Sequence, residues 1–153
     1  MMDRLNLPDF AAKIINRDGK YFIFDQTRKK YVALTPEEWV RQHFVNYLIT
    51  EKGFPAEIIA NEIAIKLNNT TKRCDTIVYN AFLEPFIIIE YKATTVDITE
   101  DVFGQIMRYN MVLHADYLIV SNGIKHICCK IDYSNKKYEF LREIPAYGEI
   151  SKP

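Results

Sequence analysis

The sequence predicts an α/β or α+β fold, with a central mixed β-sheet flanked by helices. Short β-prone runs lie before, between and after two segments with helical hydrophobic spacing, at residues 36–51 and 100–113. The chain has 153 residues, of which 48% are hydrophobic and 13% aromatic, as expected for one domain with a buried core. The predicted order is strands, helix, three central strands, helix and strands, which places helices over the sheet.

The N-terminal segment is predicted to form a small β-meander at one edge. Asp18-Gly19 separates β-prone runs at 13–16 and 20–25, which indicates a hairpin, and residues 31–34 can add a third strand. Residues 1–12 are expected either to lie over the domain or to fray. We therefore expect a single domain over residues 1–153, with a core at 35–144 and an N-terminal β extension at 1–34.

The first helix has a strong start signal. Thr35 can cap it, Pro36 suits the first helical position, and Glu38 lies three residues after the cap, as in a capping box. We expect it to run to about Glu51. Its core-facing residues, at helical spacing, are Trp39, Val40, Phe44, Tyr47 and Leu48. A further helical turn is expected at 55–59, a strand at 60–67 (a segment ambiguous between helix and strand), and a polar turn at 68–72.

The second helix is predicted to follow the cap Thr99, with acidic residues in its first turn that complement the helix dipole. One face carries Val102, Phe103, Ile106, Met107 and Leu113. Gln105 and Tyr109, four residues apart, lie together at the edge of that face. Strands are then expected at 117–121 and 125–132 around an Asn-Gly turn, with a last edge strand at 137–141 and a loose tail after Pro145.

Composition restricts the function. Lys+Arg and Asp+Glu number 20 each, so the net charge gives no support to a general nucleic-acid binder, although the run 28-RKK-30 could form a local basic strip. Three cysteines, two of them adjacent, make neither a disulfide framework nor a zinc-ligand pattern. No run approaches the roughly 18 apolar residues of a membrane span, and the N-terminus lacks a signal-peptide core. We expect a soluble cytoplasmic protein without a membrane partner.

The most informative stretch runs from Arg73 to Lys92 and predicts two strands, at 73–79 and 85–92. Because side chains alternate along a strand, Glu90 and Lys92 should point to the same side. Asp75 lies near the start of the first strand, where antiparallel pairing would bring it beside the end of the second. Two carboxylates and a lysine at one sheet end suit Mg²⁺ and an attacking water, as metal-dependent phosphodiester cleavage requires. The alternative interpretation is a surface salt bridge.

With these residues the chain resembles the PD-(D/E)XK nuclease superfamily, and most closely the N-terminal nuclease domain of type I restriction enzyme R subunits. The resemblance covers roughly residues 35–144. The resembling segments are 37-EEWVRQHFVNYLI-49, 73-RCDTIVY-79, 87-IIIEYKA-93, 103-FGQIMRYNMVL-113 and 117-YLIVSNGIKHICCKID-132. Cys74 replaces the proline of the motif, a common departure in this superfamily. The resemblance implies a restriction-endonuclease-like fold.

The resemblance also implies roles for the residues at the sheet end. Asp75 and Glu90 would ligate Mg²⁺ or Mn²⁺, with the main-chain oxygen of Tyr91 as a third protein ligand. Lys92 would orient or help to deprotonate the attacking water and stabilise the developing negative charge.

Four further residues are accessory candidates on the same resemblance. Gln105 and Tyr109 match an accessory motif thought to support the metal site and the DNA backbone. Superfamily members often add an acid from the first helix, for which Glu38 is the nearest candidate, although it also suits the capping box. Glu62, on a neighbouring strand, is a second candidate.

The implied activity is that of a metal-dependent DNA endonuclease domain. No G-x-x-x-x-G-K-[S/T] phosphate loop is present, so we expect the chain to lack the ATP-driven motor that restriction subunits also carry. DNA and a separate motor or specificity subunit are the expected partners, and double-strand cleavage would suit a homodimer. The alternative is a nuclease-fold module that binds DNA or a partner with weak or no catalysis, which the neutral charge and the missing motor favour.

Overall fold

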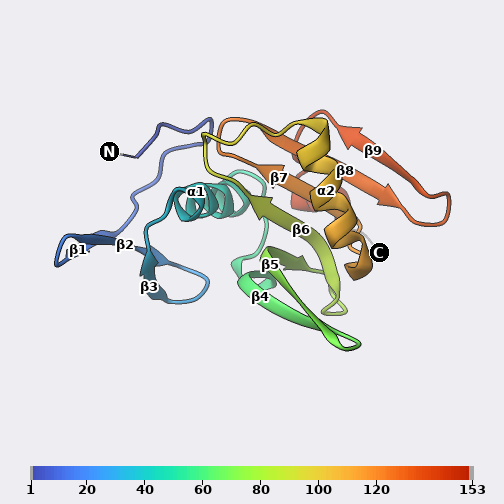
Figure 1. Cartoon of the computed structure of the whole chain (residues 1–153), viewed down its shortest axis with the longest axis horizontal. Helices are drawn as coiled ribbons and strands as arrows, with labels where there is room; N and C mark the ends of the chain where they lie inside the picture. Colours follow the sequence, from blue (N-terminus) through green and yellow to red (C-terminus); the bar gives the residue numbers. More distant parts are fainter. Residues whose placement is uncertain (1, 152–153) are drawn as a thin grey trace.

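A six-stranded mixed sheet forms the centre of the molecule (Figure 1). The computed structural model describes residues 2–151, apart from the side chain of Leu67. The strands lie in sequence order: β4 (Ile59–Leu67), β5 (Thr70–Tyr79), β6 (Pro85–Tyr91), β7 (Tyr117–Ser121), β8 (His126–Asp132) and β9 (Lys137–Leu141). Every neighbouring pair is antiparallel except β6 and β7, which are parallel and are connected through helix α2 (Glu100–Asn110). The predicted mixed sheet flanked by helices is confirmed.

The sheet buries a hydrophobic core on each face. Alternate residues of β6 divide between them: Ile87 and Ile89 pack with helix α1 (Pro36–Thr50), whereas Ile88 packs with α2. Val40, Phe44 and Leu48 of α1 are fully buried in the first core. Because each such side chain contributes about 1.5–3 kcal/mol on burial, the period-two pattern of β6 fixes which residues face which helix.

Both long helices begin as the sequence predicts. The Thr35 side chain accepts a hydrogen bond from the main-chain nitrogen of Glu38 at 3.0 Å, and Thr99 accepts one from Val102 at 3.2 Å. Helix α2 ends at Asn110, and a 3₁₀ turn (Met111–Leu113) follows it. Leu113 is therefore buried in the second core but lies beyond the α-helix in which it was expected.

The N-terminal meander is a separate three-stranded sheet of β1 (Ile14–Arg17), β2 (Lys20–Asp25) and β3 (Lys30–Ala33). Asp18 and Gly19, at φ 53° and 84°, make the hairpin turn, as the Asp-Gly signal predicts. The preceding residues lie over the domain. The main-chain nitrogen of Asn6 donates to the oxygen of Gly123 at 2.8 Å, and Trp39 Nε1 donates to the oxygen of Asp3 at 2.8 Å.

Two expectations, for the turn before β5 and for the C-terminal tail, are wrong. Strand β5 begins at Thr70, so the polar turn predicted over 68–72 is shortened to its first two residues by pairing between Leu67 and Thr70. The tail after Pro145 is not loose. Helix α3 (Tyr147–Ile150) packs there, since the main-chain nitrogen of Tyr147 donates to Lys52 at 2.8 Å and its ring lies 5.3 Å from that of Phe54.

The helical turn expected at 55–59 is a 3₁₀ turn (Ala56–Ile58), and the ambiguous segment after it is strand β4. The three cysteines are buried free thiols. Within residues 2–151, no helix combines the length and apolar character needed to cross a membrane.

Candidate functional site

A cavity of about 840 Å³ opens between β3, α1, α2 and the adjoining ends of β5 and β6. All the site residues predicted from the sequence line it: Glu38, Glu62, Asp75, Glu90, Tyr91, Lys92, Gln105 and Tyr109. The structure therefore brings together residues separated by more than 70 positions in the chain.

Asp75 and Glu90 lie opposite each other on adjacent strands. The antiparallel register pairs Thr76 with Ile89, so the next position places Asp75 against Glu90. The Asp75 carboxylate accepts a hydrogen bond from the main-chain nitrogen of Tyr91 at 2.9 Å. This bond holds the carboxylate at the end of β6, between Glu90 and Lys92.

The regular alternation of β5 is interrupted at Asp75. Cys74 and Ile77 both pack in the core beneath α2, although residues three apart in a regular strand face opposite sides. Across the strand pair, Glu62 has a positive φ of 56°, which is unusual for a non-glycine residue. Irregularities of this kind commonly re-aim side chains next to functional sites. Here the irregularity accompanies the turn of Asp75 and Glu62 toward the cavity.

Glu90 lies in an environment that opposes its negative charge. Burial, followed by the charge of Asp75, raises the pKa of Glu90 well above its usual range, and Asn110 and Lys92 only partly offset this. Glu90 Oε1 is buried without a hydrogen-bond partner, and so is Oδ1 of Asn110, which lines the same cavity. Unpartnered buried acceptors are costly, so the site is short of positive charge and of donors.

The donor set suits a hard divalent cation. Within residues 2–151 no group of three or more His, Cys, Asp or Glu side chains is arranged to hold a metal ion. Candidate donors in the cavity are the carboxylates of Asp75 and Glu90, the amide oxygen of Asn110 and, as the resemblance implies, the main-chain oxygen of Tyr91. Mg²⁺ fits such an all-oxygen set, because it keeps several of its waters and needs only one or two carboxylates. Zinc would favour nitrogen and sulfur ligands.

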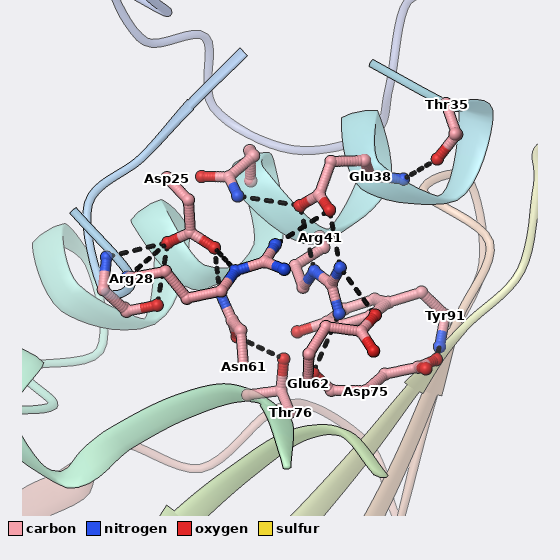
Figure 2. A network of polar contacts seen from close by, with 12 residues as sticks. Asp25, Arg28, Thr35, Glu38, Arg41, Asn61, Glu62, Asp75, Thr76 and Tyr91 are labelled. Carbon is pink, nitrogen blue, oxygen red and sulfur yellow. Dashed lines mark hydrogen bonds and ion pairs between the residues drawn. The ribbon is translucent and has the colours of Figure 1, made fainter. Parts of the chain in front are cut away.

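Arg41 of α1 connects the first helix to the site (Figure 2). Its Nη1 donates to the main-chain oxygen of Asp75 at 2.9 Å, and its Nε donates to Glu38 Oε2 at 2.9 Å. Its Nη2 also pairs with Glu62 Oε1 at 2.9 Å. Although burial opposes its charge, the hydrogen bond to Glu38 raises the pKa of Arg41, so the guanidinium stays charged.

The contacts of Glu38 and Glu62 favour a positioning role over metal binding. Arg28 and Arg41 pair with Glu38, and Gln42 donates to it at 2.8 Å. Arg73 pairs with Glu62 at 2.7 Å, in addition to Arg41. Glu38 also does not complete the capping box, because its carboxylate is engaged by these side chains.

A buried chain of polar side chains extends from Arg41, through Glu38 and Arg28, to the N-terminal sheet (Figure 2). Asp25 of β2 pairs with Arg28 and accepts from Asn61 Nδ2 at 3.1 Å. Asn61 Oδ1 in turn accepts from the Thr76 hydroxyl at 2.7 Å. Although burial raises it, hydrogen bonds from Asn61 and Arg28 lower the pKa of Asp25 overall. The N-terminal extension is thus connected to the strand that carries Asp75.

Gln105 and Tyr109 of α2 form another wall of the cavity. Tyr109 is 54% exposed, and the Lys72 ammonium lies 3.2 Å from the centroid of its ring. This cation–π contact orients the ring at the rim of the cavity. Sequence reasoning missed Lys72, Arg41 and Asn110. Two features of the sequence could have indicated them: Arg41 lies three residues after Glu38 in α1, and Asn110 directly follows Tyr109.

Comparisons with known proteins identify the family and the fold of the chain. The family model for the N terminus of the type I restriction enzyme R protein matches residues 36–145. A solved fragment described as an HsdR subunit of a type I restriction enzyme from Vibrio vulnificus YJ016 has a similar fold, with a TM-score of 0.52 and 17% identity. The match covers 76% of this chain and 24% of that one, so the chain spans about a quarter of its relative's length. No match was found among curated proteins.

The family match extends over most of the chain and contains all the site residues that the sequence predicted. It runs from the first residue of α1 to the residue after Ile144, and the fold agrees with a solved relative. The chain belongs to the family of type I restriction enzyme R protein N-terminal domains.

Proposed function

We propose that this protein is a metal-dependent DNA endonuclease domain that hydrolyses phosphodiester bonds. The observation that supports this most directly is the pairing of Asp75 with Glu90 beside Lys92, in a cavity where Glu90 Oε1 has no partner. Two adjacent carboxylates repel each other and are costly to bury, so a fold that keeps them together favours a cation between them.

The chain's own residues have distinct parts in this proposal. Asp75 and Glu90 would bind Mg²⁺ or Mn²⁺, assisted by the main-chain oxygen of Tyr91. When bound, the cation neutralises phosphodiester charge and acidifies water. Lys92 orients the attacking water and stabilises negative charge that develops on the phosphate oxygens. Gln105 and Tyr109, at the rim, contact the DNA backbone beside the bond that is cut.

The partners follow from the family. We propose that the domain acts within a type I restriction system, in which other segments or subunits supply DNA translocation and sequence recognition. Cleavage of both strands would need two such sites, as in a homodimer.

A cleavage assay tests the enzyme directly. Supercoiled plasmid incubated with Mg²⁺ or Mn²⁺ should be nicked or linearised by the wild type and left intact by Asp75→Asn, Glu90→Gln and Lys92→Met. Matched controls on exposed positions, Asp97→Asn, Glu139→Gln and Lys137→Met, should cleave like the wild type. An inert wild type, or full cleavage by Asp75→Asn, would refute the proposal.

A second candidate is a binding module without turnover. It is favoured by the absence of a third acidic ligand among the described residues, since Glu38 and Glu62 are held by arginines. Calorimetry with Mn²⁺ separates the two. Binding that disappears in Asp75→Asn supports the nuclease, whereas no binding in the wild type supports the module.

A further inference from the structure

The N-terminal sheet presents one face outward. Its register pairs Ile15 with Phe22 and Phe22 with Ala33, which places them on one side. The opposite side carries Ile23 and Asp25, both 0% exposed, so that side packs on the body of the protein. By the same alternation the outward face carries Lys13, Arg17, Lys20, Phe22, Phe24 and Tyr31.

The outward face is positively charged in a chain that is neutral overall. Residues 13–34 contain six basic and two acidic residues, a net charge of +4. Asp25 is buried on the other side, and Asp18 lies in the turn, so this face of the described sheet carries no acid. Lys13, Arg17 and Lys20 are all exposed. Although the net charge of the whole chain is zero, this face is therefore a basic surface, of the kind that attracts polyanions.

Aromatic rings hold two of these cations close to the sheet. The Lys13 ammonium lies 5.5 Å from the centroid of Phe24, and the Arg17 guanidinium lies 5.8 Å from that of Phe22. The Phe24 ring packs edge-on against Tyr31 at 5.2 Å. Cation–π contacts restrict long flexible side chains, so less conformational entropy remains to be lost when an anion binds.

The outward face continues into the candidate site. Ala33 belongs to it and also lines the cavity that contains Asp75 and Glu90. Figure 1 shows the hairpin of β1 and β2 projecting from the body beside α1. A polyanion lying on the face therefore approaches the cavity from the side of β3.

We propose that the outward face of the N-terminal sheet binds the phosphate backbone of the DNA on one side of the cleavage site. This inference rests on the proposed nuclease function and identifies where the flanking substrate lies. Lys13, Arg17 and Lys20 neutralise phosphates, while Phe24 supports Lys13 and Phe22 supports Arg17. Contacts to phosphates are independent of sequence, as suits a cleavage domain that does not choose its site.

The test measures DNA binding under conditions that prevent cleavage. Fluorescence anisotropy with a labelled 30-base-pair duplex, in EDTA and at several salt concentrations, compares the wild type with the triple variant K13Q/R17Q/K20Q. Each lost phosphate contact lowers the salt slope by about 0.9, so the triple variant should lose about 2–3 from the slope and about tenfold or more in affinity at low salt. The control K66Q/K137Q/R142Q removes the same charge from exposed positions elsewhere and should bind like the wild type.

Three results would overturn the inference. They are an unchanged slope in K13Q/R17Q/K20Q, an equal loss in the control variant, and displacement of the duplex by polyglutamate as readily as by unlabelled duplex. A labelled single strand run in parallel distinguishes a surface for duplex from one for an unpaired strand, and binding of either through this face supports it. The assay contains no divalent metal, so it does not depend on catalysis. A protein that binds DNA through this face but never cleaves plasmid would refute only the nuclease proposal.

Discussion

Arg41 Nη1 donates a hydrogen bond to the main-chain oxygen of Asp75 at 2.9 Å. The same guanidinium pairs with Glu38 and Glu62, so one side chain connects α1 to both β4 and β5. Its fork of donors fits several acceptors at once, which a lysine ammonium cannot do in the same geometry. The position of the Asp75 main chain therefore depends on a residue outside the motif that carries the carboxylates.

Arg41→Met should destabilise the fold and weaken metal binding. It leaves Glu38, which is 5% exposed, short of a cation, and breaking a buried pair in this way costs about 3–5 kcal/mol. A loss of about 3 kcal/mol should lower the Tm by about 6–12 °C in a domain of this size. Arg41→Lys should recover part of the Tm but less of the Mn²⁺ affinity, because it keeps the charge without the bond to Asp75.

Leu48→Ala is the matched control for Arg41. Leu48 is fully buried in the α1 core, and its truncation costs about 2–5 kcal/mol without touching the site. Its Tm should fall by a similar amount while its Mn²⁺ affinity, measured by calorimetry below the Tm, stays at the wild-type value. Equal affinities in Arg41→Met and Leu48→Ala would show that Arg41 only stabilises the fold.

Divalent cations should stabilise the folded protein through Asp75 and Glu90. At a concentration about 100 times the Kd, a cation adds about 2.7 kcal/mol, or about 5–11 °C of Tm. Asp75→Asn should abolish this shift. Glu90→Gln should also abolish it while raising the metal-free Tm, because the amide removes a charge that burial and Asp75 both oppose. A metal-free Tm that falls in Glu90→Gln would contradict this account.

Two sets of buried groups should destabilise the protein in acid, against the opposite effect of Glu90, whose raised pKa favours the folded state as the pH falls toward 4.5. Burial lowers the pKa of His43 and His126 below the usual value of 6.5, so the unfolded chain binds protons more readily and stability falls below about pH 6.5. Although burial raises both values, hydrogen bonds from Asn61 and Arg28 lower the pKa of Asp25 overall, and the hydrogen bond from Arg41 lowers that of Glu38. The contribution of both carboxylates is therefore complete above about pH 4.5 and is lost below it. Urea denaturation between pH 8 and pH 3 measures both losses of stability.

Asp25→Asn should remove much of the loss of stability below about pH 4.5 and leave the loss that begins near pH 6.5 unchanged. The amide keeps the volume of Asp25 but cannot pair with Arg28, so its stability at pH 7 should be lower and less dependent on pH below 4.5. Asp97→Asn is the control, because that carboxylate is exposed and its substitution leaves the buried polar chain intact. An acid profile unchanged by Asp25→Asn would exclude the buried chain as its source.

The sequence predicted what local patterns encode. The caps at Thr35 and Thr99, the Asp-Gly turn and the alternation of β6 each act over a few residues, and the structure confirms them. The convergence of Asp75 with Glu90 was also predictable, because it needed only the pairing of two consecutive strands. Arg41 was missed because its partner Asp75 lies 34 positions away, and the positive φ of Glu62 has no signal in residue type.

Asn110 should contribute to cation binding. Its Nδ2 donates to the main-chain oxygen of Ile106 at 2.8 Å, which fixes the amide and leaves Oδ1, buried and unpartnered, in the cavity that also holds Glu90 Oε1. Removing a group that supports a metal ligand commonly reduces affinity 10–100-fold, so Asn110→Ala should weaken Mn²⁺ binding by about tenfold. Asn110→Asp adds a third carboxylate, so it should bind Mn²⁺ more tightly and lower the metal-free Tm. Asn46→Ala, in α1 at a position that does not line the cavity, should change neither quantity. An unchanged Mn²⁺ affinity in Asn110→Ala would confine the donor set to the two strands.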